Sequence, residues 1–373
     1  MRIGLISPPW LAVPPPAYGG IEFVVDLLAR GLAAAGHEVL LAAPSNSSCP
    51  VPLVSGLPVA PAHAELSDHS LVELRHVKAA YSAMRGMDMV HDHTVAGPLY
   101  RYRPTALPVI ATNHGTFVYG LGELYEAMSD VTIVAISYHQ ASTAHGVNIN
   151  RVIHHGLDLG TVPVGLGTGR YACFLGRMSP DKGVREAILI ARRAGVPLVI
   201  AAKMRQAAEV EFYRDVVEPM LGGEVEYVGE LGGAAKYELL GGAFALLNPI
   251  QWPEPFGLVM IESLATGTPV VTTPAGAAPE IVDDGVTGYL RTGLDGLTEA
   301  LTGAADLDRS ACRRVVADRF SAARMVADHL DLYAEVAAAP KRAGFRRAHR
   351  FSSMLRTLDR GPVGPLDDTR DIG

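Results

Sequence analysis

The feature that most constrains the fold is an alternation, repeated twice, of short β-branched apolar segments with longer segments of helical periodicity. The first series has strand candidates at RIGLIS (2–7), EVLLAAP (38–44), MDMVHDH (87–93), VIATNH (109–114), VTIVAIS (131–137) and RVIHHG (151–156). The second series has strand candidates at YACFLG (171–176), PLVIAA (197–202), VEYVGE (225–230), FALLNPI (244–250) and PVVTTP (269–274). This alternation is typical of βαβ units around a buried parallel sheet.

A Gly/Pro-rich, almost uncharged stretch at 156–170 separates the two series. We therefore predict an α/β protein with two doubly wound Rossmann-like domains, at 1–160 and 161–325. A third segment, 326–373, is predicted to contain the end of a final helix (321–339) and a basic tail. Ligands of doubly wound sheets bind beyond the carboxyl ends of the strands, so we expect the site in a cleft between the domains.

The charge of the chain argues against a nucleic-acid partner. Its 373 residues carry a formal net charge of -7, whereas nucleic-acid binding calls for a basic face. The tail from Lys341 onward is the exception, with 8 Lys/Arg and 4 Asp/Glu. We leave two interpretations of it open: a mobile solvated tail, or a basic face with Phe345, Phe351 and Leu355 that makes a weak peripheral contact with anionic lipid or with a partner.

The cysteines and the N-terminus favour a cytoplasmic protein. The three cysteines, Cys49, Cys173 and Cys312, are far apart and form no CxxC or Cys/His cluster, so neither a disulfide framework nor a zinc site is indicated. Pro8 and Pro9 interrupt the first apolar run before a signal-peptide core is complete. No stretch is long enough in apolar residues to predict a transmembrane helix.

The loop PPWLAVPPPAYGGIE (8–22) places Gly19 and Gly20 at the start of a helix that begins near Ile21 and stops at Gly36. Paired glycines at a helix N-terminus let backbone N–H groups approach a phosphate, although the same pair is often only structural. The pattern is not GxGxxG, and the second strand has no acidic residue at its end for a ribose. Both facts count against a dinucleotide oxidoreductase.

The segment FLGRMSPDKG (174–183) places Arg177 just past a strand and Lys182 at the start of the next helix. Two cations at one strand-to-helix turn can both approach one diphosphate, Arg177 as a fork and Lys182 as a point charge. The alternative is a surface arginine and lysine beside an ordinary turn.

The segment EPFGLVMIE (254–262) carries two carboxylates. Pro255 suits a first helical position, which predicts a helix from near Phe256 with Glu254 in the loop before it and Glu262 two turns, roughly 12 Å, along it. The helix start would offer sugar hydroxyls or an oxyanion the free N–H groups of Phe256, Gly257, Leu258 and Val259. A glycosidase pair is the alternative, but it needs carboxylates about 5 to 9.5 Å apart.

The histidines of MVHDHT and RVIHHG leave further alternatives. His91 and His93 share one face of a strand and could be metal ligands, strand-end residues near an acceptor, or packed structural residues. His154 and His155 are adjacent and would face opposite sides of a strand, which argues against a joint site.

Taken in order, YGGIE, ATNHG, HHGLD, GRMSPDKG, EPFGLVMIE, GTPVV and PEIVDDGVTGYL resemble the retaining family 4 glycosyltransferases of GT-B fold, over nearly the whole chain to about residue 335. The resemblance implies that Arg177 and Lys182 grip the donor diphosphate and that Glu254, with the amides of Phe256 and Gly257, binds donor-sugar hydroxyls. It further implies that Glu262 holds the nucleotide ribose. No metal and no cofactor are then required.

The resemblance also gives roles to the first half. Gly19 and Gly20 would close on the phosphates, His114 would face the reacting sugar, and the nucleobase would be read by backbone near the ends of 197–202 and 225–230. Two positions depart from the family pattern: His155 replaces the usual Asn before Gly, which we expect to affect only the linker, and Gly276-Ala277-Ala278 replaces the usual Gly-Gly. The second change leaves the contact of that loop with the donor open.

The sequence therefore predicts a retaining glycosyltransferase that moves a sugar from a nucleoside-diphosphate donor, UDP-sugar first and GDP-sugar next, to a hydroxyl acceptor. A natural product, an oligosaccharide and a lipid-linked intermediate are all compatible acceptors, and the Ala- and Pro-rich composition is typical of a GC-rich bacterial genome. Two alternatives share the fold: a sugar phosphorylase and a non-catalytic nucleotide-sugar binder.

Overall fold

Two six-stranded parallel sheets form the framework of the computed structural model, which describes residues 1–59, 66–104, 106–118 and 120–339. The first sheet has the order β2-β1-β3-β4-β5-β6, with β1 (Arg2–Ile6), β2 (Glu38–Ala42), β3 (Met89–Asp92), β4 (Val109–Thr112), β5 (Val131–Ala135) and β6 (Ile149–Val152). The second has the order β12-β11-β10-β7-β8-β9, with β7 (Ala172–Arg177), β8 (Leu198–Lys203), β9 (Val225–Tyr227), β10 (Ala245–Asn248), β11 (Val270–Thr272) and β12 (Gly288–Leu290). The predicted doubly wound α/β class is confirmed.

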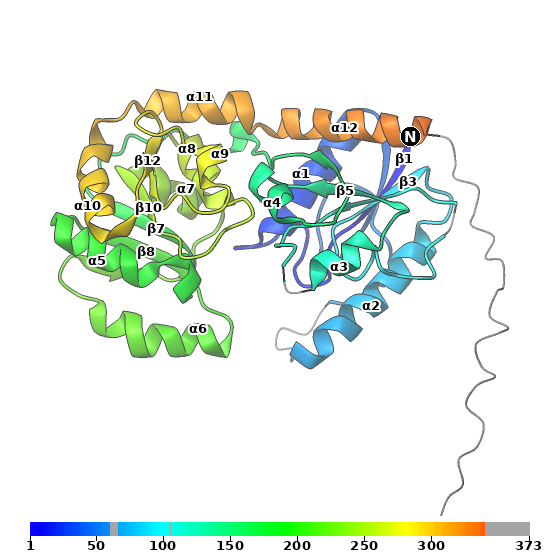
Figure 1. Cartoon of the computed structure of the whole chain (residues 1–373), viewed down its shortest axis with the longest axis horizontal. Coiled ribbons are helices and arrows are strands. Elements are labelled where there is room, and N and C mark those ends of the chain that lie inside the picture. Colours follow the sequence, from blue (N-terminus) through cyan, green and yellow to red (C-terminus); the bar gives the residue numbers. More distant parts are fainter. Residues whose placement is uncertain (60–65, 105, 119, 340–373) are drawn as a thin grey trace, which may run out of the picture. The chain divides into compact units, whose positions relative to one another are not determined.

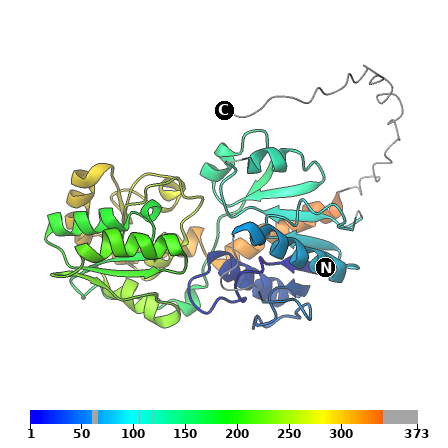
Figure 2. The same cartoon turned by 90° about the horizontal axis from the view of Figure 1, so that it is seen from below.

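Helices lie on both faces of the sheets (Figure 1 and Figure 2). Those of the first half are α1 (Gly20–Ala34), α2 (Leu66–Ala83), α3 (Leu121–Glu126) and α4 (Tyr138–Thr143). Those of the second half are α5 (Val184–Ala194), α6 (Ala207–Phe212), α7 (Gly233–Gly242), α8 (Leu258–Ala265), α9 (Ala278–Ile281), α10 (Gly293–Gly303) and α11 (Arg309–Arg319), followed by the last helix, α12 (Ala322–Ala338). None of the helices in the described ranges is long and apolar enough to span a bilayer.

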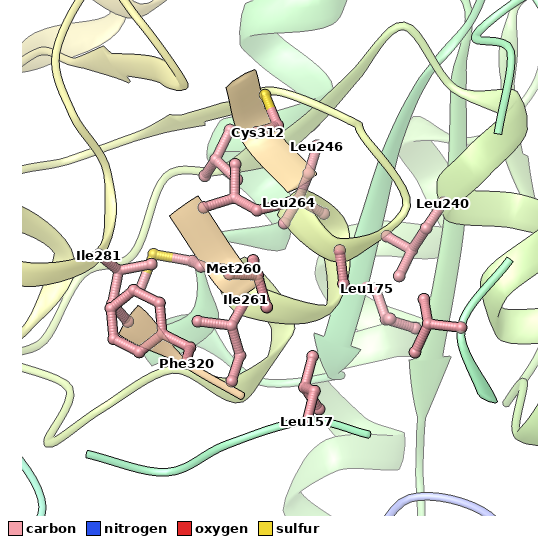
Figure 3. Close-up of a cluster of buried hydrophobic side chains, with 14 of the residues drawn as sticks. Leu157, Leu175, Leu240, Leu246, Met260, Ile261, Leu264, Ile281, Cys312 and Phe320 are labelled. Carbon is pink, nitrogen blue, oxygen red and sulfur yellow. The ribbon is translucent and has the colours of Figure 1, made fainter. Parts of the chain in front are cut away.

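The strands are apolar along their whole length because both faces of each sheet are covered. In β1, Ile3 and Leu5 pack in the same cluster as Leu28 of α1, whereas Ile6 packs in a second cluster with Tyr81 of α2. In the second half, Figure 3 shows Met260, Ile261 and Leu264 of α8 in one cluster with Leu246 of β10 and Cys312 of α11. Alternation of side chains across a pleated strand produces this two-sided burial.

Two predicted boundaries differ from the structure, and one strand was not predicted. The strand β6 ends at Val152, so His154 and His155 follow the strand instead of lying on opposite faces of it. The helix α8 begins at Leu258 and not near Phe256. The strand β12 was not predicted, because it has three residues, the first of them Gly288, and these give too short a pattern to recognise.

The last helix returns to the first half of the chain. The N–H of Leu157 donates to the carbonyl of Phe320 and the N–H of Ala322 donates to the carbonyl of Leu157, both at 2.8 Å. Beyond this point α12 buries Met325, Leu332 and Tyr333 in the same core as α1, and Gly31 leaves room for the close approach of Val326. The basic tail from Lys341, with its predicted mobility or lipid contact, lies outside the described residues.

Candidate functional site

The start of α8 differs from the prediction because of one glycine. Gly257 has φ of +96°, a left-handed conformation that helix interiors exclude, and it serves as the N-cap of α8. Phe256 and Gly257 therefore precede the helix, and of the four amides expected at the helix start only those of Leu258 and Val259 belong to it. The prediction of a helix from Phe256 was wrong by two residues.

Glu254 and Lys182 form a buried ion pair beside this turn. The Lys182 Nζ lies 2.5 Å from Glu254 Oε1, and the two side chains are 10% and 16% exposed. Lys182 ends a short 3₁₀ turn (Pro180–Lys182) before α5, and its Nζ lies 5.3 Å from the centre of the Trp252 ring. Because a partly buried charge needs a partner, each of these two groups holds the other in place.

The loop that departs from the family pattern fixes the backbone of Glu254. The N–H of Ala277 donates to the Glu254 carbonyl at 3.0 Å. Gly276 has φ of +62°, and a Cβ at this position would collide with Glu254 backbone atoms. The loop therefore holds Glu254 through main-chain contacts.

Arg177 is the last residue of β7 and is held by acidic side chains. Its guanidinium donates to Asp181 at 2.8 Å and to Ser179 at 3.2 Å. Burial opposes ionisation of Asp181, but the hydrogen bond from Ser179 and the charges of Arg177 and Lys182 together lower the pKa of that carboxyl. The positive charges of Arg177 and Lys182 thus both favour the ionised form of Asp181.

The loop before α1 reaches these residues from the first half of the chain. The Tyr18 N–H donates to Glu230 Oε1 at 3.1 Å, and a Cβ built on Gly20 would lie 3.1 Å from Cδ1 of Leu258. Burial first, and then the charge of Glu254, raise the pKa of the Tyr18 phenol. Gly20 thus lies against the start of α8, whereas Gly19 packs against its own loop at Pro15.

Glu262 lies in α8 and pairs with Lys236 of α7, with 2.5 Å between Oε1 and Nζ. Burial opposes the charge of Lys236, but Glu262 and Tyr237 raise its pKa above the usual value. Sequence reasoning did not identify Lys236, because nothing in its local sequence connects it with a residue 26 positions later.

Two more basic residues were missed near Tyr18. The Nζ of Lys203 lies 4.9 Å from the centre of the Tyr18 ring, and Arg205 pairs with Glu230 at 2.5 Å. Lys203 is the last residue of β8, so its place at the carboxyl end of a parallel strand was a usable signal.

His114 follows β4 and belongs to a row of stacked histidine rings. Its ring is 5.2 Å from that of His155 at an interplanar angle of 19°, and the ring of His155 meets that of Phe256 edge-on at 4.9 Å. The expectation that His155 affects only the linker was therefore wrong, because it connects His114 to the turn before α8. Burial lowers the pKa of His114 to about 3, so its imidazole is neutral at pH 7.

His91 is a packed structural residue. Its Nδ1 lies 2.7 Å from the Tyr333 hydroxyl and its Nε2 lies 2.7 Å from Oγ1 of Thr112. Both ring nitrogens are occupied, which leaves none for a metal. In the part of the chain that the structure describes, no group of three or more His, Cys, Asp or Glu side chains has the arrangement of a metal site.

A cavity of about 590 Å³ lies at the carboxyl ends of β10 and β11, next to Glu254. Its wall includes Trp252, Thr273, Gly276 and Thr292, with Glu186 from α5 and His139 from α4. The volume is in the range of small-molecule sites, and the wall contains both polar and apolar residues.

Two family models match the chain. Residues 18–160 match "Glycosyltransferase Family 4" and residues 165–295 match "Glycosyl transferases group 1". Between them the two models include every residue proposed above for the site.

Two curated relatives match most of the chain. A phosphatidyl-myo-inositol mannosyltransferase of Mycolicibacterium smegmatis is 26% identical over 83% of this chain and 86% of the relative. A glycogen synthase of Mycobacterium tuberculosis is 27% identical over 86% of this chain and 89% of the relative. The names of the two relatives refer to unlike compounds, phosphatidyl-myo-inositol and glycogen.

Solved structures show the same fold. AviGT4, a glycosyltransferase involved in avilamycin A biosynthesis, is 26% identical, and its structure aligns with a TM-score of 0.69. The alignment covers 91% of this chain and 99% of the AviGT4 chain. The Anabaena protein HepE, in complex with UDP and glucose, is 18% identical and aligns with a TM-score of 0.69. The alignment covers 90% of this chain and 99% of the HepE chain. The GT-B fold implied by the resemblance is confirmed.

Proposed function

The chain belongs to glycosyltransferase family 4, and from that membership we propose that it transfers a sugar, with retention, from a nucleoside-diphosphate donor to a hydroxyl group of an acceptor. The observation that carries the proposal is the placement of two cations at one strand-to-helix turn: Arg177 ends β7 and pairs with Asp181, and Lys182 pairs with Glu254 in the loop before α8. This is the charge pattern that a departing diphosphate needs.

Breaking the anomeric C–O bond places new negative charge on the leaving diphosphate. Cations and amides that are already fixed at that position stabilise the transition state more than the ground state. Each such donor contributes about 3 kcal/mol by analogy with oxyanion-hole donors. In this proposal Arg177 and Lys182 neutralise the leaving group without a metal, and the leaving phosphate accepts the proton of the attacking hydroxyl.

The other residues bind the two ends of the donor. Glu254 accepts hydrogen bonds from sugar hydroxyls beside the amides of Phe256, Gly257, Leu258 and Val259, and His114 contacts the reacting sugar. Glu262 accepts from the ribose hydroxyls once Lys236 yields part of its contact. Gly20 supports this assignment by its place against Leu258, because backbone N–H groups at the start of α1 then approach the same region.

We favour a UDP-sugar as donor, ahead of a GDP-sugar, and the cytoplasm as the compartment. The acceptor is proposed only as a hydroxyl compound, since the names of the relatives refer to compounds as unlike as phosphatidyl-myo-inositol and glycogen. A sugar phosphorylase of the same fold would use a sugar phosphate in place of a nucleotide-sugar as donor, and a non-catalytic binder would have no turnover. Turnover that falls when Arg177 is replaced would also distinguish an enzyme from a non-catalytic binder.

The proposal is tested by thermal denaturation with UDP, GDP, ADP, dTDP, NAD and pyridoxal phosphate, each with and without EDTA. A ligand at 100 times its Kd adds about 2.7 kcal/mol to the free energy of unfolding, which raises Tm by about 2 to 4 °C for a chain of this size. We expect one nucleoside diphosphate to give a selective shift that EDTA leaves unchanged. A shift with NAD or pyridoxal phosphate alone, or with none of the six, would contradict the donor assignment.

Replacement of Glu262 by alanine is expected to weaken nucleoside-diphosphate binding by about 10- to 100-fold, because a charged hydrogen-bond acceptor contributes about 1.5 to 3 kcal/mol. Isothermal titration with the nucleotide found above measures this change. Glu238→Ala, on the exposed side of α7, removes a carboxylate near the site without touching Glu262 and is the matched control. Unchanged affinity in Glu262→Ala would remove the ribose role.

A further inference from the structure

His114 has a second histidine directly behind it. His93 follows β3, is 4% exposed, and places its Nδ1 2.9 Å from Nε2 of His114. The other nitrogen of His93, Nε2, is buried and has no hydrogen-bond partner among the residues that the structure describes. Of the two histidines, only His114 is partly exposed.

The unpaired nitrogen decides the direction of this hydrogen bond. A neutral imidazole carries one N–H and one lone pair, so the bond runs in one of two senses. If His114 donated, His93 would carry its proton on the unpaired Nε2 and would bury an N–H without an acceptor. If His93 donates from Nδ1, only a lone pair stays unpaired. Buried N–H groups without a partner are rarer than under-satisfied acceptors, which favours the second arrangement.

We propose that His93 is a positioning residue that donates its Nδ1–H to Nε2 of His114 and thereby holds His114 as the Nδ1–H tautomer. His114 then presents a neutral N–H donor, and not a base, to a hydroxyl oxygen of the bound sugar. This role in the reaction rests on the proposed function, whereas the tautomer itself does not.

The neighbouring ring of His91 gives no acceptor for an N–H at Nε2 of His93. The ring of His91 lies 4.1 Å from that of His93, but both of its nitrogens are engaged, one by Tyr333 and one by Thr112. His91 is therefore not available as an acceptor for the unpaired nitrogen of His93.

The nearly parallel ring of His155 stacks on one face of the His114 ring. The ring of His114 is thus restrained by a hydrogen bond at one edge and by a stack on one face. A group fixed before the substrate binds loses less conformational freedom when it makes its contact.

The tautomer is measured directly by ¹⁵N–¹H long-range NMR correlation of the histidine rings in the full chain, with His114→Gln to assign the signals. We expect His114 of the wild type to be protonated at Nδ1. In His93→Leu the His114 ring is expected to populate both tautomers. In His93→Asn the side-chain amide can donate from nearly the same place as Nδ1, so the preference for Nδ1–H is expected to return.

Kinetics give the second readout. Loss of one neutral hydrogen bond corresponds to about 1 kcal/mol, so His93→Leu is expected to lower kcat by about 5- to 10-fold. Nucleotide affinity is expected to stay unchanged, and His93→Asn is expected to restore most of kcat. His145→Asn, on an exposed histidine, is the matched control and is expected to leave every readout unchanged.

Two results would overturn the inference: a His114 that is unprotonated at Nδ1 in the wild type, or a tautomer that does not respond to His93→Leu. The proposed function fails separately, when no nucleoside diphosphate stabilises the wild type. In that case the NMR measurement still decides whether His93 sets the tautomer of His114.

Discussion

Replacement of Arg177 by alanine is expected to lower kcat by about 10² to 10³ while Tm changes by no more than a few degrees. The guanidinium is about one-third exposed, and its polar side-chain contacts within the described ranges are with Asp181, Ser179 and Glu209, so we expect its loss to open no cavity in a core. Removal of one fixed donor to developing negative charge costs about 3 kcal/mol of transition-state stabilisation. Steady-state turnover at saturating donor, with thermal denaturation of the same sample, measures both quantities.

Lys182→Ala is expected to reduce kcat by a similar factor, but it also removes the partner of Glu254. The variant Lys182→Ala/Glu254→Gln separates the two effects, since it removes the uncompensated carboxylate as well. Arg193→Ala is the matched control for loss of one positive charge, because Arg193 pairs with the fully exposed Asp295 at the surface.

Turnover near the wild-type value in Arg177→Ala would refute the role of Arg177 at the leaving group.

The second large effect is expected for Leu264→Ala, which should lower the free energy of unfolding by about 2 to 5 kcal/mol. Leu264 is fully buried in α8, in the cluster of Figure 3 that joins α8 to β10 and α11. Truncation removes the favourable transfer free energy of the deleted side-chain atoms. It also leaves a cavity that the packed helices and the sheet around it cannot close. The urea midpoint, followed by circular dichroism, measures the change.

Leu166→Ala is the matched control, because Leu166 is 81% exposed and the same substitution there is expected to change stability by less than about 0.5 kcal/mol. A loss below about 1 kcal/mol in Leu264→Ala would show that α8 is not held by this cluster. The position of the two proposed carboxylates, one before α8 and one within it, would then need another explanation.

The sequence predicts elements well where the pattern is long and apolar on both faces. All eleven strand candidates correspond to strands, and the final helix was predicted at 321–339 and lies at Ala322–Ala338. Errors occur where local conformation outweighs periodicity. Pro255 predicted a helix from Phe256, but Gly257 is in the left-handed region and delays the first helical residue to Leu258.

The site was predictable only in part, for a physical reason. Arg177, Lys182 and Glu254 lie at strand ends or turns with recognisable motifs, and the structure brings Lys182 and Glu254 into contact. Lys236, Tyr18 and His93 reach their partners through tertiary packing over 26, 212 and 21 positions of sequence. A periodic pattern contains no information about such pairs, so the partner of each predicted residue had to come from the structure.

The hydrogen bonds of Leu157 with Phe320 and Ala322 show where the chain can be divided into exchangeable parts. Residues 158–320 leave and re-enter the first half at one place, so the second half is topologically an insertion in the first, with adjacent ends. Both junctions of such an insert can be exchanged together without cutting a sheet. The second half of another family member can therefore be transplanted as a single block, while β1 to β6 and α12 of this chain stay intact.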